Sequence, residues 1–214
     1  MKYKYIFFDL DGTLTDSAPG ITNSVAYALK KYGIDADPKE LIPFVGPPLI
    51  TSFKERYGFS EEQAREAVVF YREYFADKGL FENIPYEGIA DTLCRLNENG
   101  YKLVTATSKP EVYAVKIMEH FGLAKYFELI AGSSFDETRT EKYEVIEYAI
   151  EKLGIGDRSS ILMVGDRWHD VSGAKEAGMD CVAVLYGYGD RTELEGANYF
   201  ASSPIEVADV IESF

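Results

Sequence analysis

Short apolar runs alternate along the chain with longer segments in which apolar residues recur at helical spacing. The apolar runs are nearly continuous, as in strands that are covered on both faces of a sheet. Strands are predicted at Tyr3–Phe8, Lys102–Ala106, Glu128–Ala131, Ile161–Val164 and Cys181–Leu185, with a shorter one at Tyr199–Ala201. The helical segments between them each stop at a glycine, the usual left-handed end of a helix. They are predicted at Ile89–Asn99, Val112–Phe121, Glu144–Leu153 and Val171–Ala177.

Strands that alternate with helices predict a parallel sheet with helices on both faces, which is an α/β fold with a Rossmann-like core. Residues 17–81 depart from this pattern because they contain no strand-like run. Their apolar spacing predicts helices at Ile21–Lys31, Pro48–Tyr57 and Glu61–Ala76. We therefore expect two domains: an α/β core of residues 1–16 and 82–214, and an all-helical insert of residues 17–81.

Two pairs of polar residues fit the capping-box pattern, in which a serine and an acid or amide three residues later satisfy each other's backbone N–H groups. Ser60 with Gln63 fits it at the third helix of the insert. Ser203 with Glu206 fits it near the C-terminus.

Composition narrows the classes of function. The formal net charge of −14 disfavours a nucleic acid polymer as partner, because no basic stripe offsets it. No apolar run approaches the ~18–20 residues of a membrane span. The apolar start of the chain is cut short by acidic residues, so we expect a buried strand rather than a signal peptide, and a cytoplasmic location. The two cysteines form no CxxC pair, which disfavours a zinc cluster.

Two acidic clusters follow predicted strands. Asp9 and Asp11 come at the end of the first strand, and on a regular strand residues two apart point to one side. A bound cation or a shared proton would relieve their repulsion. Asp166 and Asp170 follow the strand at Ile161–Val164. If these strand ends meet, the carboxylates converge on a site whose hard oxygen ligands suit Mg²⁺.

Polar groups elsewhere complete a possible anion site. Thr107, Ser108 and Lys109 precede a helix N-terminus, where hydroxyl and amide groups can bind phosphate. Lys142 opens another helix and could balance charge on a phosphoryl group, although Lys109, Arg139 and Lys152 are other cations in the same domain.

Each of these residues also has a structural interpretation. The Asp9 segment could be a simple turn, Asp170 a helix cap, and Thr107 the end of a strand. Lys142 could be a solvated surface lysine. We expect His169 to be structural or exposed, and Trp168 to contribute to general packing.

Taken in order, Asp9-Leu10-Asp11-Gly12-Thr13, Thr107, Lys142 and Gly165-Asp166-x-x-x-Asp170 resemble the four motifs of the haloacid dehalogenase-like superfamily. The resemblance covers essentially the whole chain, and the insert corresponds to that family's cap domain. Further segments resemble the phosphoglycolate phosphatase branch, which includes 5′-nucleotidase relatives. They are Gly46-Pro47-Pro48-Leu49, Lys109-Pro110, Arg139-x-x-Lys142 and Tyr186-Gly187-Tyr188-Gly189.

The resemblance implies a role for each motif residue. Asp9 is the nucleophile and Asp11 the acid–base group. The Asp9 side chain, the Asp11 carbonyl and Asp166 hold Mg²⁺, supported from a second layer by Asp170. Thr107 and Lys142 bind the phosphoryl group with help from Ser108, and Lys109 and Gly46 contact phosphate or substrate.

The implied function is a magnesium-dependent phosphomonoesterase that acts through an aspartyl-phosphate on a small phosphorylated metabolite, phosphoglycolate or a nucleoside 5′-monophosphate. We expect a monomer or weak homodimer, with no nucleic acid or membrane partner. A sugar phosphomutase of the same superfamily is one alternative, and a phospho-acceptor module of the receiver type is another. A dehalogenase is disfavoured because that chemistry needs neither Asp11 nor a metal.

Overall fold

The computed structural model describes residues 1–136 and 138–214, and the chain divides into two compact units. One unit joins Met1–Asp16 to Pro85–Phe214, and the other comprises Ser17–Ile84. The short segments β2 (Thr15–Asp16) and β3 (Ile84–Pro85) pair where the chain passes between the units. No helix in the described ranges combines the length and the apolar character that crossing a membrane requires.

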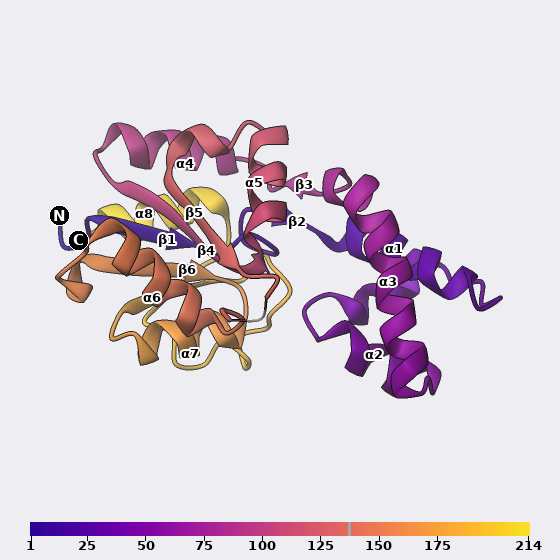
Figure 1. Cartoon of the computed structure of the whole chain (residues 1–214). Helices are drawn as coiled ribbons and strands as arrows, with labels where there is room; N and C mark the ends of the chain where they lie inside the picture. The colour runs from indigo at the N-terminus through magenta and orange to yellow at the C-terminus, as the bar shows by residue number, and fades with distance from the viewer. Residues whose placement is uncertain (137) are drawn as a thin grey trace. The chain divides into compact units, whose positions relative to one another are not determined.

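The first unit is built on a six-stranded parallel sheet with the order β5–β4–β1–β6–β7–β8 (Figure 1). Its strands are β1 (Tyr5–Phe8), β4 (Lys102–Pro110), β5 (Phe127–Ser133), β6 (Ile161–Gly165), β7 (Asp180–Val184) and β8 (Tyr199–Ala201). All six predicted strands are present, so the predicted α/β fold is confirmed.

Helices cover both faces of this sheet, with α6 and α7 on one face and α4, α5 and α8 on the other (Figure 1). They are α4 (Ile89–Glu98), α5 (Glu111–His120), α6 (Lys142–Leu153), α7 (Trp168–Glu176) and α8 (Pro204–Glu212), with short 3₁₀ turns η3 (Ala124–Tyr126) and η4 (Arg158–Ser160). Phe7 packs in a buried cluster with Val145 of α6 and Val171 of α7. Its neighbours Ile6 and Phe8 are equally buried. Since successive strand residues point to opposite faces, both faces of β1 are covered, which explains its continuous apolar run.

Helices α6 and α7 begin two and three residues earlier than predicted, because an acidic residue lies within the first turn rather than before it. In α7, the Asp170 carboxylate accepts hydrogen bonds from the amides of Asp166 (3.1 Å) and Arg167 (3.0 Å). In α6, the Glu144 carboxylate accepts from the amides of Thr140 (2.7 Å) and Glu141 (3.0 Å). In each helix the carboxylate thus accepts from amides that would otherwise be unpaired at the helix start, so α7 begins at Trp168 and α6 at Lys142.

Strand β1 lies between β4 and β6, so the segments that follow these three strands meet at one edge of the sheet. In open parallel sheets, ligands bind outside the carboxyl ends of the strands, where the direction of strand order reverses. Strand β4 runs four residues beyond its predicted end and shifts register between Thr107 and Pro110. This extension places Thr107–Lys109 at the same edge.

The second unit is helical. Its elements are α1 (Ala18–Lys30), η1 (Pro38–Phe44), α2 (Leu49–Tyr57), α3 (Glu61–Asp77) and η2 (Gly79–Phe81). Its core is rich in aromatic contacts, including the stacked rings of Phe53 and Phe59, whose centroids are 5.8 Å apart.

Of the two predicted capping boxes, the one at α3 is confirmed and the one at α8 is half formed. The Gln63 amide donates to Ser60 Oγ (3.2 Å), and the Ser60 amide donates to Gln63 Oε1 (2.9 Å). At α8 the Glu206 amide donates to Ser203 Oγ (3.3 Å), but the Glu206 carboxylate accepts from the amide of Ser202 instead of Ser203.

We predict that Ser60→Ala lowers the free energy of unfolding by about 1 kcal/mol, because it removes the acceptor for an otherwise unpaired amide at the start of α3. Urea denaturation followed by circular dichroism measures the change. Ser60→Asp keeps an acceptor at the same position, so its stability should stay close to that of the wild type. Equal losses in the two variants would contradict the assignment of this cap.

Candidate active site

Four carboxyl groups gather at the carboxyl edge of the sheet. Asp9 and Asp11 follow β1, Asp166 follows β6, and Asp170 lies in the first turn of α7. Asp9, Asp166 and Asp170 are buried, whereas Asp11 is partly exposed. Two lysines from other segments of the chain pair with Asp9, Asp11 and Asp170.

Asp9 is a buried carboxylate that its neighbours keep ionised. Burial by itself would raise its pKa, but the Lys142 ammonium lies 2.9 Å from Asp9 Oδ1 and outweighs that effect. The His169 imidazole and a hydrogen bond from Thr107 add to the lowering. The pKa of Asp9 therefore lies below its usual value, as an attacking carboxylate requires at neutral pH.

Lys142 is buried rather than solvated, so the surface interpretation of this residue is wrong. Its Nζ lies 2.9 Å from Asp9 Oδ1 and 2.8 Å from Asp170 Oδ1, and it donates a 2.8 Å hydrogen bond to the Ala106 carbonyl. Burial lowers the pKa of a lysine, but here the charges of Asp170 and Asp9 prevail and raise it. The alternative cation Arg139 instead donates to the Gly132 carbonyl and pairs with Glu111.

Asp11 is paired with a lysine of its own. Lys109 Nζ lies 2.9 Å from Asp11 Oδ2, and the lysine side chain is only 6% exposed. We expected Asp9 and Asp11 to share a cation or a proton as neighbours on one face of a strand. Strand β1 ends at Phe8, so the two residues are not neighbours on a regular strand, and each carboxylate meets a different lysine. The shared cation stays a prediction.

Ionisation of Asp166 is disfavoured by its surroundings in the described part of the chain. Burial raises its pKa well above the usual value, and the nearby carboxylates of Asp170 and Asp9 raise it further. Its Oδ2 accepts a 2.8 Å hydrogen bond from the Tyr188 amide, and its Oδ1 accepts from Thr13 Oγ1 at 3.4 Å. Neither donor is a cation, so a bound divalent cation would stabilise the ionised form.

Glycines on two loops allow the backbone to approach Asp166 closely. A Cβ added at Gly12, whose φ is +81°, would lie 2.1 Å from Asp166 Oδ2. One added at Gly187 would lie 2.4 Å from Asp166 Cβ and from the Gly12 carbonyl oxygen. The part that Gly187 plays at the site was missed, because its segment was noted only for its resemblance to one branch of a family.

His169 is a second residue that was missed, and the prediction for Trp168 is wrong. One potential ligand atom each from Asp9, His169 and Asp170 lies within 4.8 Å of the others. The position of His169 directly before Asp170, in the first turn of α7, is the signal that could have identified it. Trp168 is 57% exposed and therefore does not contribute to general packing.

The charge and chemistry of these residues fit Mg²⁺. Four carboxyl groups face two ammonium groups, so full ionisation of the described side chains would leave an excess of negative charge that a divalent cation would offset. The carboxyl groups offer hard oxygens, which Mg²⁺ prefers, beside one imidazole nitrogen from His169. The predicted site residue Gly46 lies in the helical unit, between η1 and α2, with φ at +103°. Its contact with substrate stays a prediction, as do the roles of Ser108 and Thr107.

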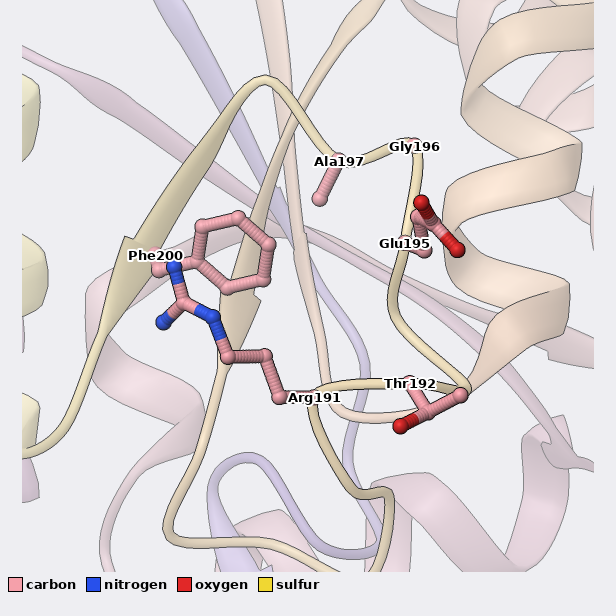
Figure 2. A pocket seen from close by; sticks show the side chains of 6 residues that line it. All are labelled: Arg191, Thr192, Glu195, Gly196, Ala197 and Phe200. Atoms are coloured by element: carbon pink, nitrogen blue, oxygen red, sulfur yellow. The ribbon is translucent and has the colours of Figure 1, made fainter.

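A surface hollow elsewhere on the sheet unit is unrelated to this cluster. It has a volume of about 440 Å³ and is lined by Arg191, Thr192, Glu195, Gly196, Ala197 and Phe200 (Figure 2). The Arg191 guanidinium lies over the Phe200 ring, 4.4 Å from its centroid. No residue of the acidic cluster lines this hollow.

Known proteins resemble this chain over nearly its full length. A family model described as haloacid dehalogenase-like hydrolase matches residues 6–184. A 5′-nucleotidase from Pseudomonas aeruginosa is 43% identical over 100% of this chain and 97% of its own length. A phosphoglycolate phosphatase from Neisseria gonorrhoeae is 34% identical over 88% of this chain and 83% of its own. A crystal structure from Clostridium difficile, 46% identical, superposes with a TM-score of 0.95 over 99% of both chains.

We predict that Lys142→Met lowers the free energy of unfolding by ~3–5 kcal/mol near pH 7 in EDTA, because it leaves buried carboxylates without a counter-ion. The lowered pKa of Asp9 stabilises the folded state at pH values above the pKa that Asp9 has in the unfolded chain. This stabilisation is lost as the pH falls through the lower pKa that Asp9 has in the folded state. The gap in free energy of unfolding between the wild type and the variant should therefore narrow at low pH.

Urea titrations across a pH series measure this gap. Lys175→Met removes an exposed lysine on α7 and should leave stability nearly unchanged at every pH. A pH-independent loss in Lys142→Met would mean that packing rather than charge is responsible.

Proposed function

Since the chain belongs to the haloacid dehalogenase-like hydrolase family and is a phosphatase, we propose that it hydrolyses small phosphate monoesters with Asp9 as nucleophile. The observation that supports this most directly is the state of Asp9: a buried carboxylate whose pKa is held below its usual value by Lys142, 2.9 Å away. An ionised carboxylate at the crowded edge of a parallel sheet is suited to attack phosphorus.

The reaction has two steps. In the first, an Asp9 oxygen attacks phosphorus, the bond to the ester oxygen breaks, and Asp11 gives a proton to the departing alcohol. In the second, Asp11 takes a proton from water as that water attacks the phosphorus of the aspartyl-phosphate, which releases inorganic phosphate and restores Asp9. Division into two steps replaces one difficult displacement by two easier ones. Lys142 and Thr107 orient the phosphoryl oxygens, with Ser108 beside them.

Repulsion between the carboxylates and an anionic substrate is the main obstacle to the first step. We assign Mg²⁺ to the Asp9 side chain, the Asp11 carbonyl and Asp166, with Asp170 supporting the site. When bound, Mg²⁺ supplies positive charge that offsets this repulsion and holds the reacting groups in line. Lys142 contributes a second positive charge and pairs with both Asp9 and Asp170.

The substrate class follows from the relatives rather than from the site. Phosphoglycolate and nucleoside 5′-monophosphates are the first candidates, because relatives named for both activities resemble the chain over most of its length. We assign substrate selection to the helical cap, residues 17–81, including Gly46. Cytoplasmic location and a monomeric or weakly dimeric state stay predictions from the sequence.

We predict that Mg²⁺ raises the thermal unfolding temperature of the wild type and has no such effect on Asp166→Asn. A ligand at about 100 times its Kd stabilises a protein by about 2.7 kcal/mol. In EDTA near pH 7, Asp166→Asn should be at least as stable as the wild type. Because the pKa of Asp166 is raised in the folded state, its ionisation destabilises the fold at pH values above the pKa that Asp166 has in the unfolded chain. The amide of asparagine carries no charge and avoids this cost.

Differential scanning calorimetry with MgCl₂ or EDTA measures both effects. Asp35→Asn, at an exposed position in the helical unit, should respond to Mg²⁺ like the wild type. An undiminished Mg²⁺ response in Asp166→Asn would remove Asp166 from the metal site.

We predict that Asp9→Asn abolishes phosphate release, because an amide cannot replace the nucleophile. Asp11→Asn should lower kcat/KM for alkyl phosphates by about 10²–10⁴-fold, the usual contribution of an acid–base group. A screen of phosphorylated metabolites with Mg²⁺ or EDTA measures free phosphate, and sugar phosphates assayed for isomers test the phosphomutase alternative. Phosphorylation of the chain without turnover would favour the receiver-type alternative.

A further inference from the structure

We propose that Lys109 is a positioning residue for the acid–base group: its ammonium holds one oxygen of Asp11 and leaves the other free to exchange the proton. This inference rests on the proposed function, because it concerns how Asp11 performs its step. It differs from the sequence-based expectation, in which Lys109 contacts phosphate or substrate.

The first argument is the ion pair itself. Lys109 Nζ lies 2.9 Å from Asp11 Oδ2, and the side chains are 6% and 26% exposed, respectively. A pair between mobile, solvated side chains is weak and holds no fixed geometry. Here the lysine is enclosed, so its side chain has little freedom to leave the pair. The pair therefore restrains the Asp11 carboxylate to one orientation.

The second argument is the state of the other oxygen. Asp11 Oδ1 is buried and has no hydrogen-bond partner among the described residues. A buried polar atom left without a partner is costly and calls for an explanation. An acid–base group needs one oxygen that is not occupied by a protein donor, so that it can carry the proton to and from the reacting ester. With Oδ2 held by Lys109, Oδ1 meets that need.

The third argument is that one short segment serves both reacting carboxylates. The Lys109 amide donates a 3.2 Å hydrogen bond to Thr107 Oγ1, and Thr107 in turn hydrogen-bonds to Asp9. Pro110 follows and favours an extended backbone at Lys109. This end of β4 thus positions Asp9 through Thr107 and Asp11 through Lys109.

Substrates with different leaving groups distinguish a positioning role of Lys109 from a role in phosphate binding. In the first step a proton moves from Asp11 Oδ1 to the ester oxygen as the bond from that oxygen to phosphorus breaks. An alkoxide needs this proton, whereas p-nitrophenolate leaves readily without it. The ratio kcat/KM reports the steps up to formation of the aspartyl-phosphate, so hydrolysis of that intermediate does not obscure the comparison.

The test compares kcat/KM for glycerol 3-phosphate and p-nitrophenyl phosphate in the wild type, Lys109→Met, Lys109→Arg, Asp11→Asn and the Lys109→Met/Asp11→Asn double variant. We expect Lys109→Met to lose at least ~10-fold more activity on the alkyl than on the aryl ester, within the ~10²–10⁴-fold range of a general acid. Lys109→Arg should recover much of this loss, because it keeps the charge. The double variant should be little worse than Asp11→Asn alone, since both changes remove one function.

Lys116→Met is the matched control, because Lys116 is exposed on the next helix, α5, and should behave like the wild type. Equal losses on both esters with a raised KM would mean that Lys109 binds the phosphoryl group, and would overturn the inference. Circular dichroism checks that each variant is folded, and if Lys109→Met does not fold, Lys109→Gln replaces it. Retained turnover in Asp9→Asn would instead show that the proposed function itself is wrong.

Discussion

The active site depends on one buried ammonium group. Lys142 Nζ lies within 3 Å of Asp9, Asp170 and the Ala106 carbonyl, with very little exposure to solvent. Without it, two buried carboxylates would face each other in a medium of low dielectric, where like charges cannot both persist. With it, Asp9 stays ionised while enclosed, which is the state that the proposed nucleophile needs.

The same contact connects the chemistry to the architecture of the sheet unit. Asp170 caps the start of α7 through the amides of Asp166 and Arg167, and its other oxygen meets Lys142 at the start of α6. A change at Asp170 would therefore disturb a helix N-terminus and the charge balance of the site together. Asp170 therefore has two roles: it caps a helix, as its sequence position indicates, and it also belongs to the acidic cluster.

Positive charge in this site is distributed according to function. Lys142 pairs with Asp9, the proposed nucleophile, and Lys109 pairs with Asp11, the proposed acid–base group. Among the described residues, Asp166 accepts hydrogen bonds from neutral donors, so it is the carboxyl group that the proposed metal ion would stabilise most. The whole chain carries a net charge of −14, and the proposed anionic substrate would need lysines and a divalent ion to reverse the local field.

The amino-acid sequence alone determined the strands, the helices, the α/β class and the acidic and polar motifs, because these follow from local spacing and from residue chemistry. Tertiary structure decided the pairing of charges. Asp9 and Lys142 are 133 residues apart in the chain, and they meet because β4 is the neighbour of β1 in the sheet and α6 packs against β4 and β5. The separate lysine for Asp11, the approach of Gly187 to Asp166 and the place of His169 likewise depend on which strand ends are neighbours. No local pattern contains that information, since contact across a sheet is set by strand order and close packing.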